Sequence, residues 1–253
     1  MREIADDELY ARGAATLLAS WEEYARASDG ATVQHLEGVS AAVFPRGPGR
    51  GVYNNALLER DLGPRRSARA VDALEAAYRS AGVDSYAAWV HESDDGMRAE
   101  LAGRGYTIDE VTRAMGLALD DIALPPPAIE LVAPSWPEYV AFLQADGVPA
   151  GLLDDADPGA FHTLAARLGA DTVATALAFD HEDDCGVFNV STVESARRRG
   201  LGSALTARLV HDARTRGCRT ATLQSTGMAE RIYASLGFRD LGRFLEYVPG
   251  DAG

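Results

Sequence analysis

A basic stretch punctuated by glycines, from Val190 to Ser203, has the residue types that bind an anion. It reads Val-Ser-Thr-Val-Glu-Ser-Ala-Arg-Arg-Arg-Gly-Leu-Gly-Ser. The pattern predicts a strand that runs into a tight turn, followed by an amphipathic helix. The first N–H groups of a helix lack partners within the helix, and the helix dipole and nearby arginines favour phosphate there. We therefore predict an anion-binding turn, although many Gly-x-Gly turns only connect two elements.

The composition limits the class of protein. Hydrophobic residues make up 47% and charged residues 25% of the 253 residues, which is typical of globular proteins and sufficient for one large or two ordinary domains. The net charge of −14 argues against a nucleic-acid partner, because such proteins normally present a basic face. The sequence contains no lysine, which excludes a lysine nucleophile or Schiff base.

Membrane and metal partners are not expected. No apolar run approaches the roughly 20 residues of a membrane span, and the first residues lack the apolar stretch of a signal peptide, so we expect a cytoplasmic protein. Cys185 and Cys218 lie on predicted strand edges without the spacing of metal ligands, and we interpret them as structural thiols.

The hydrophobic periodicity predicts alternating helices and strands on either side of a proline-rich linker at residues 120–127. Segment 161–168 is ambiguous between a helix and a hairpin strand, and we favour the strand. We place a domain boundary after Leu124, which gives domains 1–124 and 125–253. The predicted helices cover residues 6–27, 67–81, 96–102 and 135–143; the predicted strands cover 31–36, 39–44, 52–57, 84–90, 106–119, 129–132, 172–179, 186–193 and 220–224.

Short sequences recur between the two halves at nearly constant offsets. Residues 51–54 (Gly-Val-Tyr-Asn) recur as 186–189 (Gly-Val-Phe-Asn), and Gly82 recurs as Gly217, both 135 positions later (217 − 82). Residues 101–106 parallel residues 233–238 at an offset of 132. The matches favour a tandem repeat with the order strand, helix, strand, helix, strand, the alternative being chance similarity in an alanine-rich sequence.

The first half lacks the anion-binding turn. At the offset of 135, the positions of the arginine and the two glycines of the turn hold Leu62, Arg65 and Ser67. At the offset of 132, Tyr233 corresponds to Leu101. We therefore predict that one half carries the chemistry and that the other keeps only the scaffold.

Two motifs resemble those of the GNAT superfamily of acyl-CoA-dependent N-acyltransferases. Residues 197–202 (Arg-Arg-Arg-Gly-Leu-Gly) fit its Arg/Gln-x-x-Gly-x-Gly/Ala signature, and residues 229–238 fit its second motif, Ala-x-x-x-Tyr-x-x-x-Gly-Phe. The resemblance is clear over 172–248 and reaches the first half only as a degenerate copy. It implies an α/β (α+β) fold of two tandem GNAT-like domains, each a mixed, mostly antiparallel sheet flanked by helices.

The resemblance also implies roles for individual residues. The N–H of Val190 would bind the thioester oxygen, and Tyr233 would protonate the departing thiolate, the structural alternative being a packed aromatic ring. Acetyl-CoA would be the co-substrate, with its pyrophosphate on the amides of residues 198–203. The implied cofactor-binding residues are Val190, Thr192, Val193, Arg197, Arg198, Arg199, Gly200, Leu201, Gly202, Ser203, Thr226 and Tyr233.

The sequence departs from the family pattern in three places. Glu194 stands where the family often has proline, and Thr226 where it usually has asparagine. Gly186 stands where some members carry a glutamate, so no general base is assigned there. Other candidates are Glu246, His162, His181 and Glu230, with Asn189 as a group that orients an amine or a water; many family members act through ordered water.

These residues predict an acetyl-CoA-dependent N-acetyltransferase that acts on a primary amine of a small molecule. A protein acetyltransferase acting on lysines or an N-terminus is one alternative, because an acidic surface suits basic peptides. A non-catalytic acyl-CoA-binding regulatory module is the alternative of another class. We expect no nucleic-acid or membrane partner and a monomer or homodimer.

Overall fold

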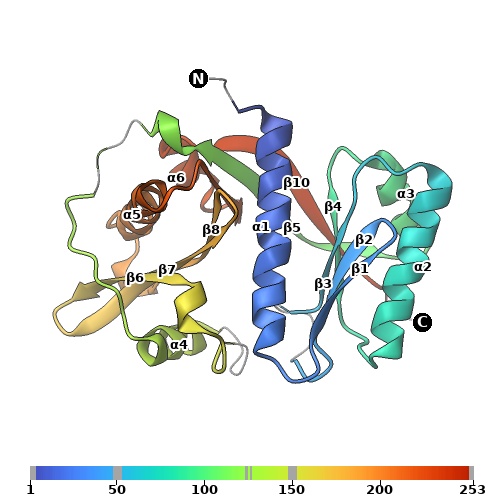
Figure 1. Cartoon of the computed structure of the whole chain (residues 1–253), viewed down its shortest axis with the longest axis horizontal. Helices are drawn as coiled ribbons and strands as arrows, with labels where there is room; N and C mark the ends of the chain where they lie inside the picture. Colours follow the sequence, from blue (N-terminus) through green and yellow to red (C-terminus); the bar gives the residue numbers. More distant parts are fainter. Residues whose placement is uncertain (1–3, 48–52, 123–124, 126, 148–152, 251–253) are drawn as a thin grey trace. The chain divides into compact units, whose positions relative to one another are not determined.

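A computed structural model describes residues 4–47, 53–122, 125, 127–147 and 153–250 (Figure 1). The chain forms two compact units, each built from separate parts of the sequence. Unit 1 consists of Met1–Ala19 and Ala114–Leu241, and unit 2 of Ser20–Arg113 and Gly242–Gly253. The predicted boundary after Leu124 lies outside the described residues and stays a prediction.

Unit 2 contains five strands in the order β1-β2-β3-β4-β10, with β3 parallel to β4 and the other pairs antiparallel. Helix α2 packs through a buried stripe that includes Leu74 and Tyr78, and Tyr78 stacks on Tyr86 with ring centroids 4.1 Å apart. The elements are β1 (Thr32–Leu36), β2 (Val39–Val43), β3 (Asn55–Leu58), α2 (Pro64–Ser80), β4 (Ala87–His91), α3 (Asp95–Gly103) and the unit 2 part of β10 (Arg239–Val248).

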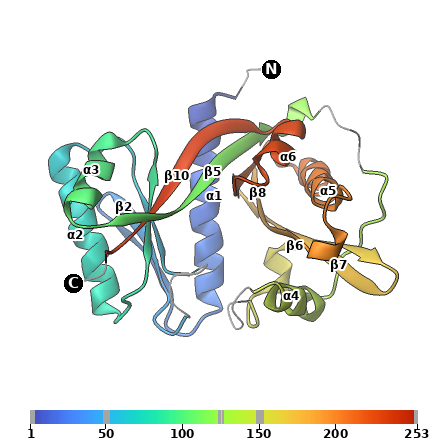
Figure 2. The same cartoon turned by 180° about the vertical axis from the view of Figure 1, so that it is seen from behind.

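Unit 1 contains the strand order β5-β9-β8-β7-β6, in which β8 and β9 are parallel and β6, β7 and β8 pair antiparallel. Helices α4 and α5 lie on opposite faces of β6, β7 and β8 (Figures 1 and 2). The elements are α1 (Asp6–Arg26, to Ala19), β5 (Thr107–Ala118, from Ala114), α4 (Trp136–Ala145), β6 (His162–Leu168), β7 (Asp171–His181), β8 (Asp184–Thr192), α5 (Leu201–Arg216), β9 (Thr220–Ser225) and α6 (Glu230–Ser235).

The core of unit 1 lies between α5 and the sheet. Leu201, Leu205, Leu209 and Ala213 recur every four residues and are all buried, as expected for one face of an amphipathic helix. They share a hydrophobic cluster with alanines at alternate positions 174, 176 and 178 of β7, whose small side chains allow α5 to approach the sheet closely.

A buried carboxylate joins α1 to the first residues of β8 within unit 1. Asp184 accepts hydrogen bonds from the hydroxyls of Thr16 (2.7 Å), Thr220 (2.6 Å) and Thr222 (2.7 Å). Burial raises the pKa of Asp184, although the three hydroxyls oppose this shift. The neighbouring Gly186 has no room for a side chain, because a Cβ there would lie 2.5 Å from the ring of Phe188.

Most sequence predictions of elements agree with the structure, and the ambiguous segment 161–168 is a strand as favoured. The predicted strand 129–132 is wrong: only an isolated bridge joins Val132 to Ala165. Proline follows closely at residue 134 and precedes at residue 127, and proline has no N–H to extend a ladder. Helix α2 begins at Pro64, three residues earlier than predicted, because proline suits the first helical turn. Cys185 and Cys218 are buried and free.

The described parts of the two halves have the same element order, three strands followed by helix, strand, helix and strand. Gly82 and Gly217 both have positive φ (+68° and +107°), and in each case the next residue donates its N–H to the carbonyl five residues back, at 2.9 and 3.0 Å. Gly105 and Gly237 (φ +86° and +96°) end α3 and α6 in the same way, with a bond of 3.1 Å in each case. The offsets of 135 and 132 therefore relate positions with the same backbone geometry.

Candidate functional site

Strand β8 separates from β9 halfway along its length. The two strands pair only from Asp184 to Gly186, and in the described part of the chain the rest of β8, through Thr192, has no partner on that side. On the other side, Leu177 pairs with Phe188 but Thr175 pairs with Ser191. Two residues of β8 thus oppose one residue of β7, which is a β-bulge, and bulges bend and twist the strand.

Asn189 is the residue that forms this bulge. Its φ is +50°, in the left-handed region that asparagine tolerates better than most residues. Its side-chain Nδ2 donates to the hydroxyl of the buried Tyr139 of α4 at 3.3 Å. The bulge changes the direction of the following Val190, so the backbone of Val190 borders the gap between β8 and β9.

The turn before α5 presents unpaired backbone donors. Gly200 precedes the helix with φ +76°, a conformation that favours glycine, and no side chain caps the helix there. The first bond within the helix runs from the N–H of Ala204 to the carbonyl of Gly200 (2.9 Å). Within the described residues, no partner is found for the N–H groups of residues 201–203, so three donors point out of the helix N-terminus.

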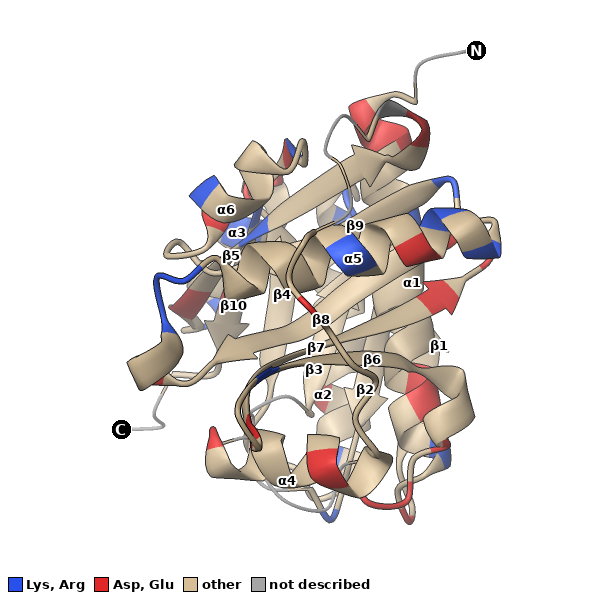
Figure 3. Ribbon diagram, turned by 90° about the vertical axis from the view of Figure 1, so that its left-hand side faces the viewer, with Lys and Arg blue, Asp and Glu red and all other residues tan. Residues whose placement is uncertain are grey.

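Arginines surround this turn. Arg197 donates through Nε to the carbonyl of Thr192 (3.1 Å) and so fixes the turn against the end of β8. Arg198 has φ +62°, and both it and Arg199 are exposed. Figure 3 shows this basic loop leading into the first turn of α5. The positive charge and the helix dipole act in the same direction, toward an anion.

A cavity of about 390 Å³ joins the end of β8, the turn before α5 and the start of α6. It brings together most of the residues predicted from the two motifs, but Val193 and Arg199 are not among its lining residues, and the N–H of Val193 is donated to Val173 (2.9 Å). The predicted residues that line it are Val190, Thr192, Arg197, Arg198, Gly200, Leu201, Gly202, Ser203, Thr226 and Tyr233. Lining residues that were not predicted to bind the cofactor are Ser191, Ala196, Met228, Ala229 and Ile232.

Tyr233 contributes a phenol hydroxyl to this cavity. Its side chain is 8% exposed, and its ring packs edge-on against Phe238 with centroids 6.0 Å apart. Burial raises the pKa of Tyr233 to about 12, so the phenol remains protonated at neutral pH. Among the described residues, its hydroxyl has no hydrogen-bond partner and remains free for a ligand.

None of the side chains predicted as bases lines this cavity. His162 lies on β6 with its Nε2 3.4 Å from Asp180, and Glu246 is buried on the part of β10 that belongs to unit 2. His181 and Glu230 are also outside the lining. The titratable lining residues are two arginines and Tyr233, so a base must come from outside the cavity or from water.

The described residues contain no group of three or more side chains arranged to hold a metal ion. Among the helices of the described part, none is long and apolar enough to cross a membrane.

Comparison with known proteins agrees with this geometry. A model of the acetyltransferase (GNAT) family matches residues 125–238, whereas no curated protein matches the sequence. A GCN5-related N-acetyltransferase from Kribbella flavida has a similar structure, with a TM-score of 0.72, 20% identity and coverage of 95% of this chain and 96% of that one.

Two further solved structures have the same fold. A GCN5-related N-acetyltransferase from Sphaerobacter thermophilus has a TM-score of 0.58 and 17% identity, and the match covers 98% of this chain and 95% of that protein's chain. A tandem GNAT protein from the clavulanic acid biosynthesis pathway has a TM-score of 0.59 and 16% identity, with coverage of 98% and 96%. The mixed α/β architecture is therefore the GNAT fold. The segment that forms the cavity matches the model of the acetyltransferase (GNAT) family, and this match supports an acyltransferase.

Proposed function

We propose that this protein transfers the acetyl group of acetyl-CoA to a primary amine of a small molecule by direct attack on the thioester. The observation that carries the proposal is the composition of the cavity of unit 1. It combines an unpaired strand edge, the free donors of a helix N-terminus and a protonated phenol. Acyl transfer from a phosphate-bearing thioester needs these three features.

Acetyl-CoA fits the groups that line the cavity. The free N–H groups of residues 201–203 suit its pyrophosphate, with the guanidinium of Arg198 as a counter-charge. The unpaired edge of β8 around Val190 and Thr192 suits the amide groups of the pantetheine arm, which can pair with it as an added strand would. The volume lies within the range of small-molecule sites.

A backbone N–H and a phenol hydroxyl of the cavity would then assist the attack on the thioester and the departure of the thiolate. The N–H of Val190, on the unpaired edge of β8, would polarise the thioester carbonyl and stabilise the charge that develops on its oxygen. As the C–N bond forms and the C–S bond breaks, Tyr233 gives its proton to the thiolate. The raised pKa of Tyr233 keeps that proton in place until the thiolate appears.

Binding and turnover experiments separate this function from its alternatives. We expect titration calorimetry to show tighter binding of acetyl-CoA than of longer acyl-CoAs, and a panel of small amines to give thiol release that depends on the amine. Release with basic peptides but with no small amine would favour a protein acetyltransferase. Coenzyme binding without release for any acceptor would show a non-catalytic binding module and would contradict the proposal.

We further propose that residues 1–124 are a degenerate copy of the catalytic domain 125–253. Strand β3 pairs with β4 at Asn55, Ala56 and Leu57, the positions that the offset of 135 relates to Val190–Thr192. At these positions the first copy therefore has a paired strand, whereas in the second copy the equivalent residues of β8 have no partner on β9. The exchange of last strands, β5 next to β9 and β10 next to β4, explains why the compact units differ from the two halves of the sequence.

A buried carboxylate in the first half also supports the proposal that residues 1–124 are a degenerate copy. Asp94, which the offset of 132 relates to Thr226, is buried and accepts the N–H groups of Asp61 and Met97, both at 3.0 Å. Asp61 begins the loop that corresponds to the anion-binding turn. A buried carboxylate thus stands where the second copy has Thr226, a residue that lines the cavity, and its negative charge would repel a phosphate.

A further inference from the structure

The side chains at the bulge of β8 divide between the two faces of the sheet. Val190 is directed toward α5, since a Cβ on Gly202 would lie 3.7 Å from its Cγ1. Its neighbours Asn189 and Ser191 instead contact α4, where Ser191 Oγ donates a short hydrogen bond to Asp146 and Asn189 donates to Tyr139. Figure 3 shows α4 and α5 on opposite faces of β7 and β8.

Because the side chains of β8 point to both faces of the sheet, the two substrates can be assigned to opposite faces. The phosphate-binding turn and Tyr233 are on the α5 and α6 side of the open strand edge, so acetyl-CoA occupies that side. An amine that attacks the thioester at Val190 must then approach from the opposite face, where the side chains of Asn189 and Ser191 lie. Ser191 is the residue that belongs to both regions, because it also lines the cavity.

Asp146 carries a carboxylate, the kind of proton acceptor that is not found among the described residues lining the cavity. The lining contains no carboxylate or imidazole among the described residues, whereas Asp146 is exposed and hydrogen-bonded to the lining hydroxyl of Ser191. Asp146 also ends α4, with its N–H bonded to the carbonyls of Phe142 and Leu143 (both 3.1 Å). The helix C-terminus carries partial negative charge, which adds to that of the carboxylate and favours a cation.

We propose that Asp146, acting through Ser191, binds the ammonium form of the acceptor and receives its proton, an inference that rests on the proposed acetyl transfer. The amine proton passes to Ser191 Oγ while the hydroxyl proton of Ser191 passes to Asp146. The neutral amine then forms the C–N bond and loses its second proton to water as the C–S bond breaks, and the thiolate takes the proton of Tyr233. Asp146, which is exposed, and Tyr233 then return to their starting protonation states by exchange with water.

The test compares an amine that must lose a proton with one that need not. Propylamine is a cation at pH 7, whereas hydroxylamine is neutral there and reacts without a base. We expect Asp146→Asn and Ser191→Ala to lower kcat/KM for propylamine by about 100-fold, to leave the rate with hydroxylamine near the wild-type value, and to keep the affinity for acetyl-CoA. Asp146→Glu, which retains a carboxylate, should keep a large part of the propylamine rate.

Asp154 offers a matched control, because it is an exposed carboxylate of the following loop that contacts only Gln144 at 3.5 Å among the described residues. Asp154→Asn should react with both amines as the wild type does. Equal losses with both amines, or no loss with propylamine, would overturn the role of Asp146. Failure of the wild type to bind acetyl-CoA would instead contradict the proposed function itself.

Discussion

At the scale of single residues, the proposed acetyl transfer depends on Tyr233. A phenol with its pKa raised to about 12 by burial is a proton donor throughout the neutral range, and it is directed into the cavity without a partner among the described residues. The ring alone would serve the structural role of packing on Phe238. Only the hydroxyl distinguishes an acid from a packed aromatic residue.

Tyr233→Phe separates these two roles. The variant keeps the ring and its packing, so we expect unchanged affinity for acetyl-CoA in calorimetry and an unchanged midpoint of urea unfolding. Thiol release in the presence of an amine should fall by about 100-fold, the typical contribution of a general acid. Turnover at the wild-type rate would leave Tyr233 with a packing role only.

At the scale of elements, the sequence motifs predicted the strand, the turn and the two helices that form the cavity. This succeeded because Gly200 and the arginines are local signals that require one backbone geometry. The bulge at Asn189 was not predicted, since alternation of side chains shows a strand but not a two-against-one register. Asp146 was missed because its contact with Ser191 joins elements 45 residues apart in sequence.

An ion pair that attaches α5 to the sheet should make the stability of the fold depend on pH. Arg216, in the last turn of α5, donates to Asp180 of β7 through Nε (2.6 Å) and Nη2 (2.8 Å), and His162 lies beside it. Burial alone would raise the pKa of Asp180, but the hydrogen bonds from Arg216 and His162 outweigh burial and lower it well below its ordinary value.

A carboxyl group with a lowered pKa stabilises the fold above its unfolded pKa, and this stability is lost as the pH falls through that value and below it. We therefore expect Asp180→Asn to reduce the free energy of unfolding by about 2 kcal/mol at pH 7. The difference from the wild type should shrink steadily as the pH is lowered below 4. Urea unfolding across this range measures it, and a difference that grows in acid would show that the ion pair is not its source.

At the scale of the whole molecule, the two halves share one element order, and in the proposed duplication only the second half keeps the binding site. Equivalent helix ends keep the same hydrogen bonds, whereas the first half has a paired strand and a buried carboxylate, Asp94, at the position of Thr226. The proposed duplication could be predicted from the sequence because glycines at helix ends repeat at fixed offsets. The exchange of the last strands was not, because strand pairing between distant segments leaves no local pattern.

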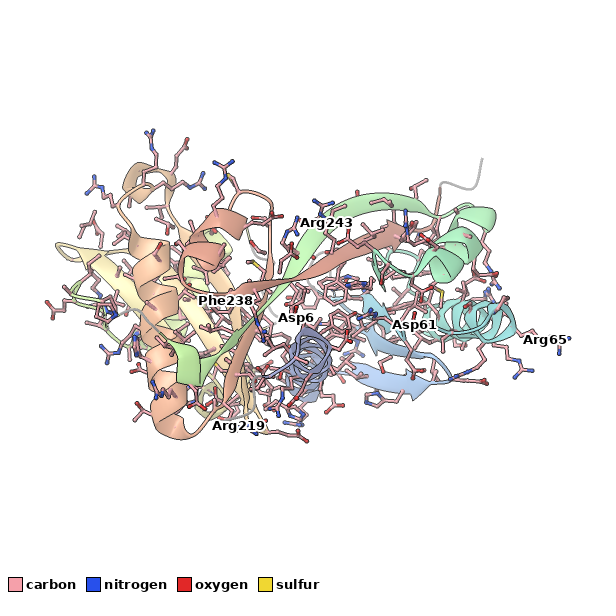
Figure 4. The ribbon with its side chains drawn as sticks, turned by 90° about the horizontal axis from the view of Figure 1, so that it is seen from above. Asp6, Asp61, Arg65, Arg219, Phe238 and Arg243 are labelled. Atoms are coloured by element: carbon pink, nitrogen blue, oxygen red, sulfur yellow. The ribbon has the colours of Figure 1, made fainter. Side chains whose placement is uncertain are left out.

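The proposed function requires that each chain binds one acetyl-CoA, at the turn before α5. Gly200 and Arg65 occupy equivalent positions in the two copies, and Arg65 projects from α2 into solvent (Figure 4). The decisive measurement is calorimetric titration of acetyl-CoA into the wild type, Gly200→Asp and Arg65→Asp. A new carboxylate at residue 200 repels the pyrophosphate. We therefore expect one site per chain in the wild type and in Arg65→Asp, and affinity lowered by at least about 100-fold in Gly200→Asp. Two sites per chain, or wild-type affinity in Gly200→Asp, would contradict it.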